Sequence, residues 1–123
     1  MYRVSVERDF DAAHYLRGYQ GKCESLHGHR FRVVVKVAAS GLDELGMAYD
    51  FTELKKHFDA VLARFDHTCL NDIFPFDTIN PSSENIARTI YDELCPRLAK
   101  APVVINCVEV WESPGSGVGY YPD

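Results

Sequence analysis

The fold is indicated most clearly by the stretch HGHRFRVVVKVAA, which spans residues 27–39. From Phe31 to Val37 the odd positions are apolar, and most of the positions between them are basic. An alternation with a period of two predicts a half-buried β-strand. His27 and His29 share the parity of the apolar residues, so we expect both side chains on the buried face, near the start of the strand.

A second alternating segment precedes this one. Apolar residues fall on even numbers from Tyr2 to Phe10, and His14 keeps the same parity. The pattern predicts another half-buried strand. We therefore expect His14 on the buried face as well, near the end of its strand.

Two helices are predicted after these strands. The first begins at Asp50, whose carboxylate can accept hydrogen bonds from free backbone N–H groups, and its apolar residues recur at helical spacing up to Phe65. The second begins near Pro81 and Ser82, residue types that suit a first turn. Pro96 is expected to end or bend it.

Two further strands are predicted over residues 103–112 and 118–121, because both segments are rich in β-branched or aromatic residues. The order ββααββ then predicts a single α+β domain over residues 1–123. We expect an antiparallel four-stranded sheet with both helices on one face. Its two free edges invite pairing with another copy of the chain.

The composition is typical of a soluble globular protein, with 46% hydrophobic and 25% charged residues. The net charge of −5 argues against nucleic acid or an anionic membrane as partners, because both need a basic patch. The N-terminus enters a strand pattern at once, which argues against an export signal, and no apolar run reaches about 18 residues. We therefore expect a cytoplasmic protein whose four cysteines are reduced.

Three histidines of the same parity point to a metal site. His14, His27 and His29 offer three neutral nitrogen ligands, the set that leaves a zinc ion one open position. Cys23, four residues before His27, completes the coordination shell of a structural zinc or acts as a thiolate of lowered pKa. The spacing leaves both interpretations open.

Three acidic or imidazole side chains complete the candidate chemistry. Asp66 and His67 follow the first helix, where His67 is either a surface histidine stabilised by the helix dipole or a proton-transfer group oriented by Asp66. Glu112 can accept two parallel hydrogen bonds from the flat amidine-like edge of a pterin or guanine. Glu109 has the opposite parity and is expected on the other face of the sheet.

Taken in order, these motifs resemble the 6-pyruvoyl-tetrahydropterin synthase family, most closely its compact bacterial members, the 6-carboxy-5,6,7,8-tetrahydropterin synthases of queuosine biosynthesis. The resemblance runs over nearly the whole chain. The residues that carry it are Phe10–His14, Cys23–His29, Gly46-Met47, Asp50-Phe51, Leu54-Lys55, Asp66-His67, Leu70-Asn71, Asn80–Asn85, Glu112 and Tyr120.

The resemblance implies the tunnelling fold, or T-fold, in which three copies close a barrel and two barrels stack into a homohexamer with active sites between subunits. It also implies 7,8-dihydroneopterin triphosphate as the substrate. The implied roles are zinc ligation by His14, His27 and His29, proton abstraction by Cys23, proton transfer by Asp66 and His67, pterin anchoring by Glu112, and a pterin pocket lined by Ser82 and Ser83.

The function expected from this resemblance is a zinc-dependent carbon–oxygen lyase that forms 6-carboxy-5,6,7,8-tetrahydropterin with loss of triphosphate and acetaldehyde. Pyruvoyl-tetrahydropterin and 6-hydroxymethyl-dihydropterin remain alternative products, since some relatives use a glutamate near the position of Glu24 as their acid or base. A hypothesis of another class is a non-catalytic, zinc-stabilised module that binds a pterin or purine.

Overall fold

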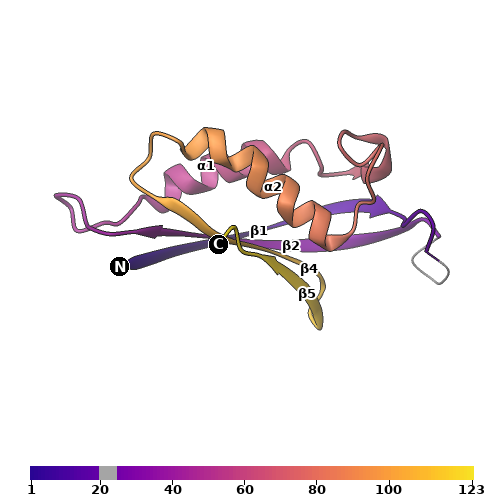
Figure 1. Ribbon diagram of the computed structural model, residues 1–123, viewed down its shortest axis with the longest axis horizontal. Helices are drawn as coiled ribbons and strands as arrows, with labels where there is room; N and C mark the ends of the chain where they lie inside the picture. Colours follow the sequence, from indigo (N-terminus) through magenta and orange to yellow (C-terminus); the bar gives the residue numbers. More distant parts are fainter. Residues whose placement is uncertain (20–24) are drawn as a thin grey trace.

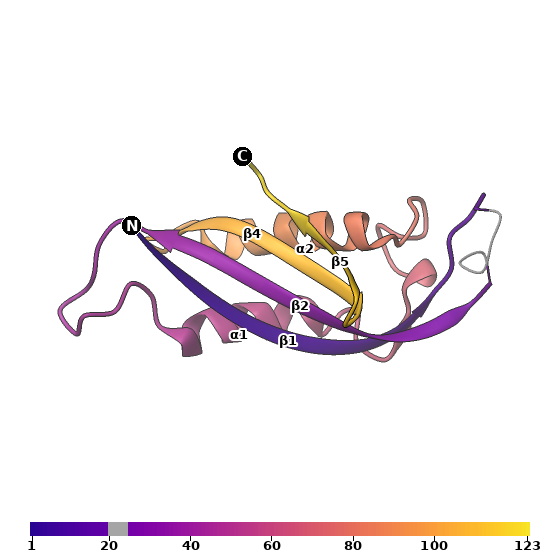
Figure 2. The same ribbon diagram turned by 90° about the horizontal axis from the view of Figure 1, so that it is seen from below.

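Two helices cover one face of a single sheet in the computed structural model, which describes residues 1–19 and 25–123 (Figure 1). Seen from below in Figure 2, the strands cross in front of both helices. The elements in chain order are β1 (Tyr2–His14), β2 (His27–Ala39), α1 (Phe51–Leu62), β3 (Thr68–Cys69), the 3₁₀ turn η2 (Leu70–Asp72), α2 (Ser83–Leu98), β4 (Val104–Ser113) and β5 (Ser116–Tyr120). The predicted α+β class, with both helices on one face, is confirmed.

The sheet has five strands in the order β3-β1-β2-β4-β5. β1 and β2 pair antiparallel along their whole lengths, from Tyr2 opposite Ala39 to His14 opposite His27. β3 pairs parallel with β1 through Thr68 opposite Ala12 and the next pair. The sheet is therefore mixed, and the prediction of a four-stranded antiparallel sheet is wrong in omitting β3. A strand of two residues is too short to show a periodicity in the sequence.

The core lies between the helices and the inner face of the sheet. Phe10 and Phe31, on neighbouring strands, stack with ring centroids 4.9 Å apart. α1 contributes Leu54 and Phe58, and α2 contributes Ile90 among its buried residues. Each apolar side chain buried in this way stabilises the fold by roughly 1.5–3 kcal/mol. Phe51, expected on the same apolar stripe, occupies the first position of α1 and stays exposed.

Side chains cap both helices at their N-termini. The Asp50 carboxylate accepts from the backbone N–H of Thr52 at 2.8 Å, as the sequence predicts. The Ser82 hydroxyl accepts from the backbone N–H of Asn85 at 3.1 Å. Pro96 does not end α2, which continues to Leu98, because a proline so close to the helix C-terminus removes only one of its last hydrogen bonds.

The outer face of the sheet carries a polar and aromatic cluster. The carboxylate of Glu109 accepts from Trp111 Nε1 and from Lys36 Nζ, both at 3.0 Å. The Trp111 ring lies against Gly117 of β5, where an added Cβ would overlap the indole. Glycine at this position therefore allows the β4–β5 pair to carry a flat ring on its outer face. Neither described helix is both long and apolar enough to cross a membrane.

Candidate active site

Three imidazoles meet where the end of β1 lies beside the start of β2. The ligand atoms that His14, His27 and His29 can offer all lie within 4.8 Å of one another. The ring centroids are 4.6 Å apart for His14 and His27, and 4.8 Å apart for His27 and His29. The structure thus brings together the three histidines that strand parity put on one face.

Backbone carbonyls orient two of these rings. Nδ1 of His14 lies 2.7 Å from the carbonyl oxygen of Pro81, and Nδ1 of His27 lies 2.6 Å from that of Ser25. A carbonyl only accepts, so each Nδ1 carries the proton and each Nε2 carries the lone pair. Metal-binding histidines in proteins are held by the same kind of outer bond.

Two of the Nε2 atoms lack a hydrogen-bond partner among the residues that the structure describes. Both atoms, those of His14 and His29, are buried. A buried polar atom left unpaired is costly, whereas a lone pair directed at a divalent cation is satisfied. The donor set therefore fits a metal ion.

Burial keeps His14 in the form that a metal ligand needs. The ring is almost fully enclosed, and this desolvation lowers the pKa of His14, although the hydrogen bond to Pro81 acts in the opposite direction. The neutral imidazole is the form with a free lone pair. This end of the sheet therefore presents a neutral nitrogen ligand at physiological pH.

The carboxylate of Glu112 lies beside the histidines. Its Oε1 is 3.7 Å from Nε2 of His29, and its Oε2 is 3.9 Å from Nε2 of His14. The Ser83 hydroxyl approaches Oε2 at 3.5 Å. Glu109 points to the opposite face, toward Lys36, so the structure places the two glutamates of β4 as their parity predicts.

A pocket of about 240 Å³ adjoins Glu112 at the N-terminus of α2. Hydroxyl, carboxyl and small apolar side chains surround it. Its lining residues are Leu16, Ser82, Ser83, Glu84, Glu112, Ser116, Gly117 and Val118. The three residues expected at a pterin site, Ser82, Ser83 and Glu112, thus line one cavity.

Asp66 and His67 form a second group with Asp11, at the outer edge of β1. Nδ1 of His67 lies 3.0 Å from the Asp66 carboxylate, and the backbone N–H of Asp11 donates to Asp66 at 2.9 Å. The bond from Asp11 lowers the pKa of Asp66, and His67 adds to the effect. His67 adopts a left-handed backbone, with φ of 59°, which costs roughly 1–3 kcal/mol and is common at functional sites.

These two residues belong to a donor group separate from the three histidines, and His67 lines a shallow pocket together with His29. Cys23 and Glu24 lie outside the described residues. The other three cysteines, Cys69, Cys95 and Cys107, are free thiols.

Sequence reasoning named Asn71 and Asn80 only as motif residues and assigned no structural role to their side chains. Asn80 and Asn71 bond to the backbone of Arg17 and Tyr15, respectively, across more than 50 positions of sequence. No local pattern could reveal such contacts. An asparagine in a loop next to a ligand-bearing strand is the one hint that the sequence offers.

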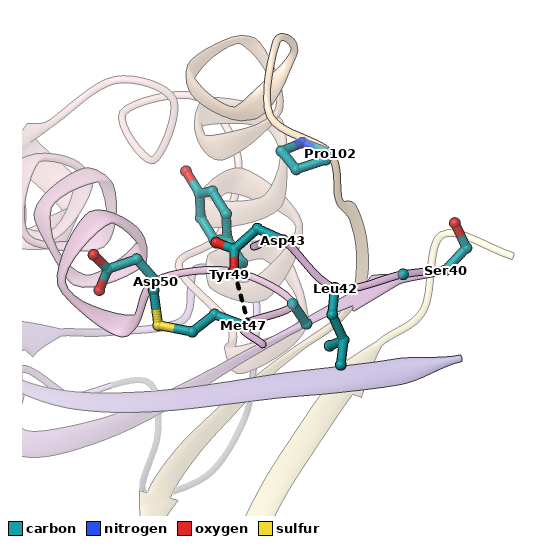
Figure 3. A pocket seen from close by; sticks show the side chains of 9 residues that line it. Ser40, Leu42, Asp43, Met47, Tyr49, Asp50 and Pro102 are labelled. Atoms are coloured by element: carbon teal, nitrogen blue, oxygen red, sulfur yellow. Dashed lines mark hydrogen bonds between the residues drawn. The ribbon is translucent and has the colours of Figure 1, made fainter. Parts of the chain in front are cut away.

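A roomier pocket, of about 530 Å³, lies at the other end of β2. Figure 3 shows Leu42, Met47, Tyr49 and Pro102 around it, together with the hydrogen bond between Asp43 and Met47. The Asp43 carboxylate is already engaged by two backbone N–H groups of its own loop. None of the three histidines lines this larger pocket, so pocket size alone does not identify the candidate active site.

Comparisons with known proteins agree with this geometry. The sequence model of the family described as 6-pyruvoyl tetrahydropterin synthase matches residues 3–123. The chain is 39% identical to the 6-carboxy-5,6,7,8-tetrahydropterin synthase of Synechocystis sp., a match that covers 98% of this chain and 94% of that protein. It is 34% identical to the 6-carboxy-5,6,7,8-tetrahydropterin synthase of Bacillus subtilis, over 98% of this chain and 86% of that one.

The fold has a counterpart among solved structures. The 6-pyruvoyl tetrahydropterin synthase of Caenorhabditis elegans superposes with a TM-score of 0.84 at 32% identity, covering 100% of this chain and 98% of that one. Sequence and fold therefore match over nearly the whole length.

Proposed function

Because the chain belongs to the 6-pyruvoyl tetrahydropterin synthase family, we propose that it is a zinc-dependent 6-carboxy-5,6,7,8-tetrahydropterin synthase acting on 7,8-dihydroneopterin triphosphate. The reaction releases triphosphate and acetaldehyde. The near full-length relatives that carry this name support the carboxylated product. The observation that carries the proposal is the convergence of His14, His27 and His29 beside the carboxylate of Glu112.

The three imidazoles hold the zinc ion in this proposal. Three neutral nitrogen ligands are typical of catalytic zinc sites, which keep a fourth position open. When bound, zinc supplies a Lewis acid that acidifies the side-chain hydroxyls of the substrate and polarises the carbonyl that develops from them. His14 and His27 keep their orientation through the carbonyls of Pro81 and Ser25.

Glu112 anchors the pterin ring. A carboxylate can accept two parallel hydrogen bonds from the amino group and the ring N–H of a pterin. The Ser83 hydroxyl approaches Oε2 of that carboxylate at 3.5 Å, and Ser82 and Ser83 form a wall of the adjoining pocket. In this pose the pterin ring lies beside the histidines, and the side chain of the substrate is directed at them.

Proton transfer is assigned to Cys23, Asp66 and His67. The Cys23 thiolate removes a proton from the side-chain carbon of the substrate. Asp66 stays ionised because the N–H of Asp11 donates to it, and it orients His67 for proton exchange. Asp66 and His67 lie at the edge of β1 in a donor group of their own, and the complete site is proposed to form between subunits, as the resemblance to the family implies.

We also propose that the protein assembles into a homohexamer. Within the described residues, β5 has one unpaired edge, and β3 covers the outer edge of β1 only at Ala12 and Ala13. Exposed strand edges pair readily with copies of the same chain. Native mass spectrometry is expected to show an assembly of six times the chain mass, and a monomer at working concentration would contradict the assembly.

The experiment that tests the function is incubation of the zinc-loaded protein with 7,8-dihydroneopterin triphosphate, followed by mass analysis of the products. We expect release of triphosphate, with a pterin product of the mass of 6-carboxy-5,6,7,8-tetrahydropterin. A pyruvoyl or hydroxymethyl pterin would keep the family and correct the product. Tight binding with no release of triphosphate would reject the enzyme and favour a binding module.

A further inference from the structure

The chain leaves the sheet after His14 and is held there by two asparagine side chains. Asn71 accepts from the backbone N–H of Tyr15 and donates to its carbonyl, both at 3.0 Å. Asn80 does the same with Arg17, at 2.9 and 3.0 Å. A primary amide that bonds both backbone groups of one residue replaces the missing strand partner. Tyr15 and Arg17 are thus fixed, although they lie beyond the end of β1.

The side chain of Arg17 adds three bonds to the irregular segment that leads into α2. Its Nη2 donates to the carbonyls of Asn71 at 3.3 Å and Phe76 at 2.8 Å, and its Nη1 donates to that of Ile79 at 3.3 Å. The guanidinium is a planar fork of fixed N–H directions, so carbonyls bonded to it keep their relative places. Arg17 therefore ties this segment to the residues that follow His14.

This network ends at the metal site. Asn80, held by Arg17 on one side and by Asn85 of α2 at 2.8 Å on the other, directly precedes Pro81. The Pro81 carbonyl accepts from Nδ1 of His14 at 2.7 Å. His14 is 1% exposed, so packing and this one bond together leave the ring a single orientation, with Nε2 toward the other histidines.

We propose that Arg17, Asn71 and Asn80 are positioning residues for the metal centre. Asn71 fixes the backbone that follows His14, and Arg17 and Asn80 fix the segment that carries the Pro81 carbonyl. Together they set the ligand orientation of His14. The inference rests on the proposed function, because it requires a metal ion at His14. Outer bonds of this kind orient metal-binding histidines, and their loss typically weakens metal binding about 10- to 100-fold.

The test compares Arg17→Gln with Arg64→Gln. Arg64 donates to the carbonyl of Phe74 at 2.9 Å and pairs with Glu93 of α2. It therefore bonds to the same irregular segment as Arg17 but links it to α2 instead of to the residues after His14. Three quantities are measured for each variant: the zinc dissociation constant by chelator competition, the visible spectrum of the Co²⁺-loaded protein, and the melting temperature without metal.

We expect Arg17→Gln to raise the zinc dissociation constant about 10-fold or more and to alter the Co²⁺ spectrum. Arg64→Gln is expected to lower the melting temperature while both metal readouts stay at the wild-type values. The inference is overturned if Arg17→Gln binds zinc like the wild type, or if the two variants weaken zinc binding equally.

A milder variant covers the case in which Arg17→Gln does not fold. Asn80→Asp keeps the size and one accepting oxygen but loses the N–H donated to the Arg17 carbonyl. It is expected to weaken zinc binding in the same direction, and unchanged binding in a folded Asn80→Asp protein rejects the inference. If the wild-type protein itself binds no zinc, the proposed function is rejected. If the wild type and the variants bind zinc equally well, only the inference about the positioning residues is rejected.

Discussion

Oε1 of Glu112 lies 3.7 Å from Nε2 of His29, so the carboxylate stands next to the imidazole cluster without hydrogen-bonding to it. The same carboxylate lines the pocket at the N-terminus of α2. Glu112 is thus placed between the candidate metal ligands and the candidate pterin pocket. This position allows two roles, as a fourth metal ligand or as the anchor of the heterocycle. The two roles predict different effects of one substitution on zinc affinity.

Glu112→Gln is expected to separate these roles. The amide keeps the shape but removes the charge that favours two parallel N–H donors, so kcat/KM should fall about 100-fold or more. Zinc affinity should stay close to that of the wild type, because the three imidazoles hold the ion in the proposed site. A collapse of zinc binding in this variant would show instead that Glu112 is a ligand.

Cys23→Ala tests the proposed base. Loss of a proton-abstracting thiolate should lower turnover about 100- to 10,000-fold. Zinc content, measured by elemental analysis, should remain one ion per chain. Simultaneous loss of zinc would make Cys23 a ligand and overturn the mechanism.

Removal of the metal is expected to lower the melting temperature. An ion that binds only the folded state adds about 2.7 kcal/mol at a free concentration 100-fold above its dissociation constant. The physical reason is that the buried Nε2 atoms of His14 and His29 have no hydrogen-bond partner in the described part of the chain. Calorimetry with and without a chelator measures the shift. His29→Ala serves as the control, because its melting temperature should no longer respond to zinc.

Gly117→Ala is expected to destabilise the fold by about 1–3 kcal/mol. The new Cβ overlaps the Trp111 ring and displaces it from Glu109, 3.0 Å away, and from Arg32. Gly115→Ala is the matched control, since a Cβ there meets open space. Urea denaturation followed by the fluorescence of the single tryptophan compares the two variants. Equal stabilities would contradict the packing of Trp111 on Gly117.

Asp66→Asn is expected to show a pH-dependent loss of stability. The N–H of Asp11 and then His67 lower the pKa of Asp66 below its ordinary value of 3.8. A lowered carboxyl pKa contributes stability that is fully present above the ordinary value and disappears as the pH falls through the folded-state value. The variant should therefore melt below the wild type at pH 7, and the gap should narrow toward pH 3. A gap independent of pH would contradict this.

Residue parity made much of the site accessible from the sequence. Side chains alternate along a strand, so the odd positions of β2 and the even positions of β1 face the same core. That rule alone puts His14, His27 and His29 on one face, and it puts Glu109 and Glu112 on opposite faces. The structure shows both arrangements.

Contacts distant in sequence were beyond this reasoning. β3 has only two residues, too few for an alternating pattern in the sequence. It forms because Thr68 and Cys69 pair with Ala12 and Ala13 of β1. The bonds of Arg17 to the carbonyls of Phe76 and Ile79 depend on side-chain and loop geometry. Such features follow from tertiary packing, which leaves no local repeat in the sequence.

The pairing of His14 with His27 in the β1–β2 register has a consequence for maturation of the protein. A slip of one residue would turn every side chain of one strand to the opposite face and scatter the donor atoms. Only the observed register brings together the three imidazoles of the proposed metal centre. If the proposed ion binds there, metal content per chain reports the share of correctly paired hairpins, and scarcity of the ion removes its stabilisation of the correct register.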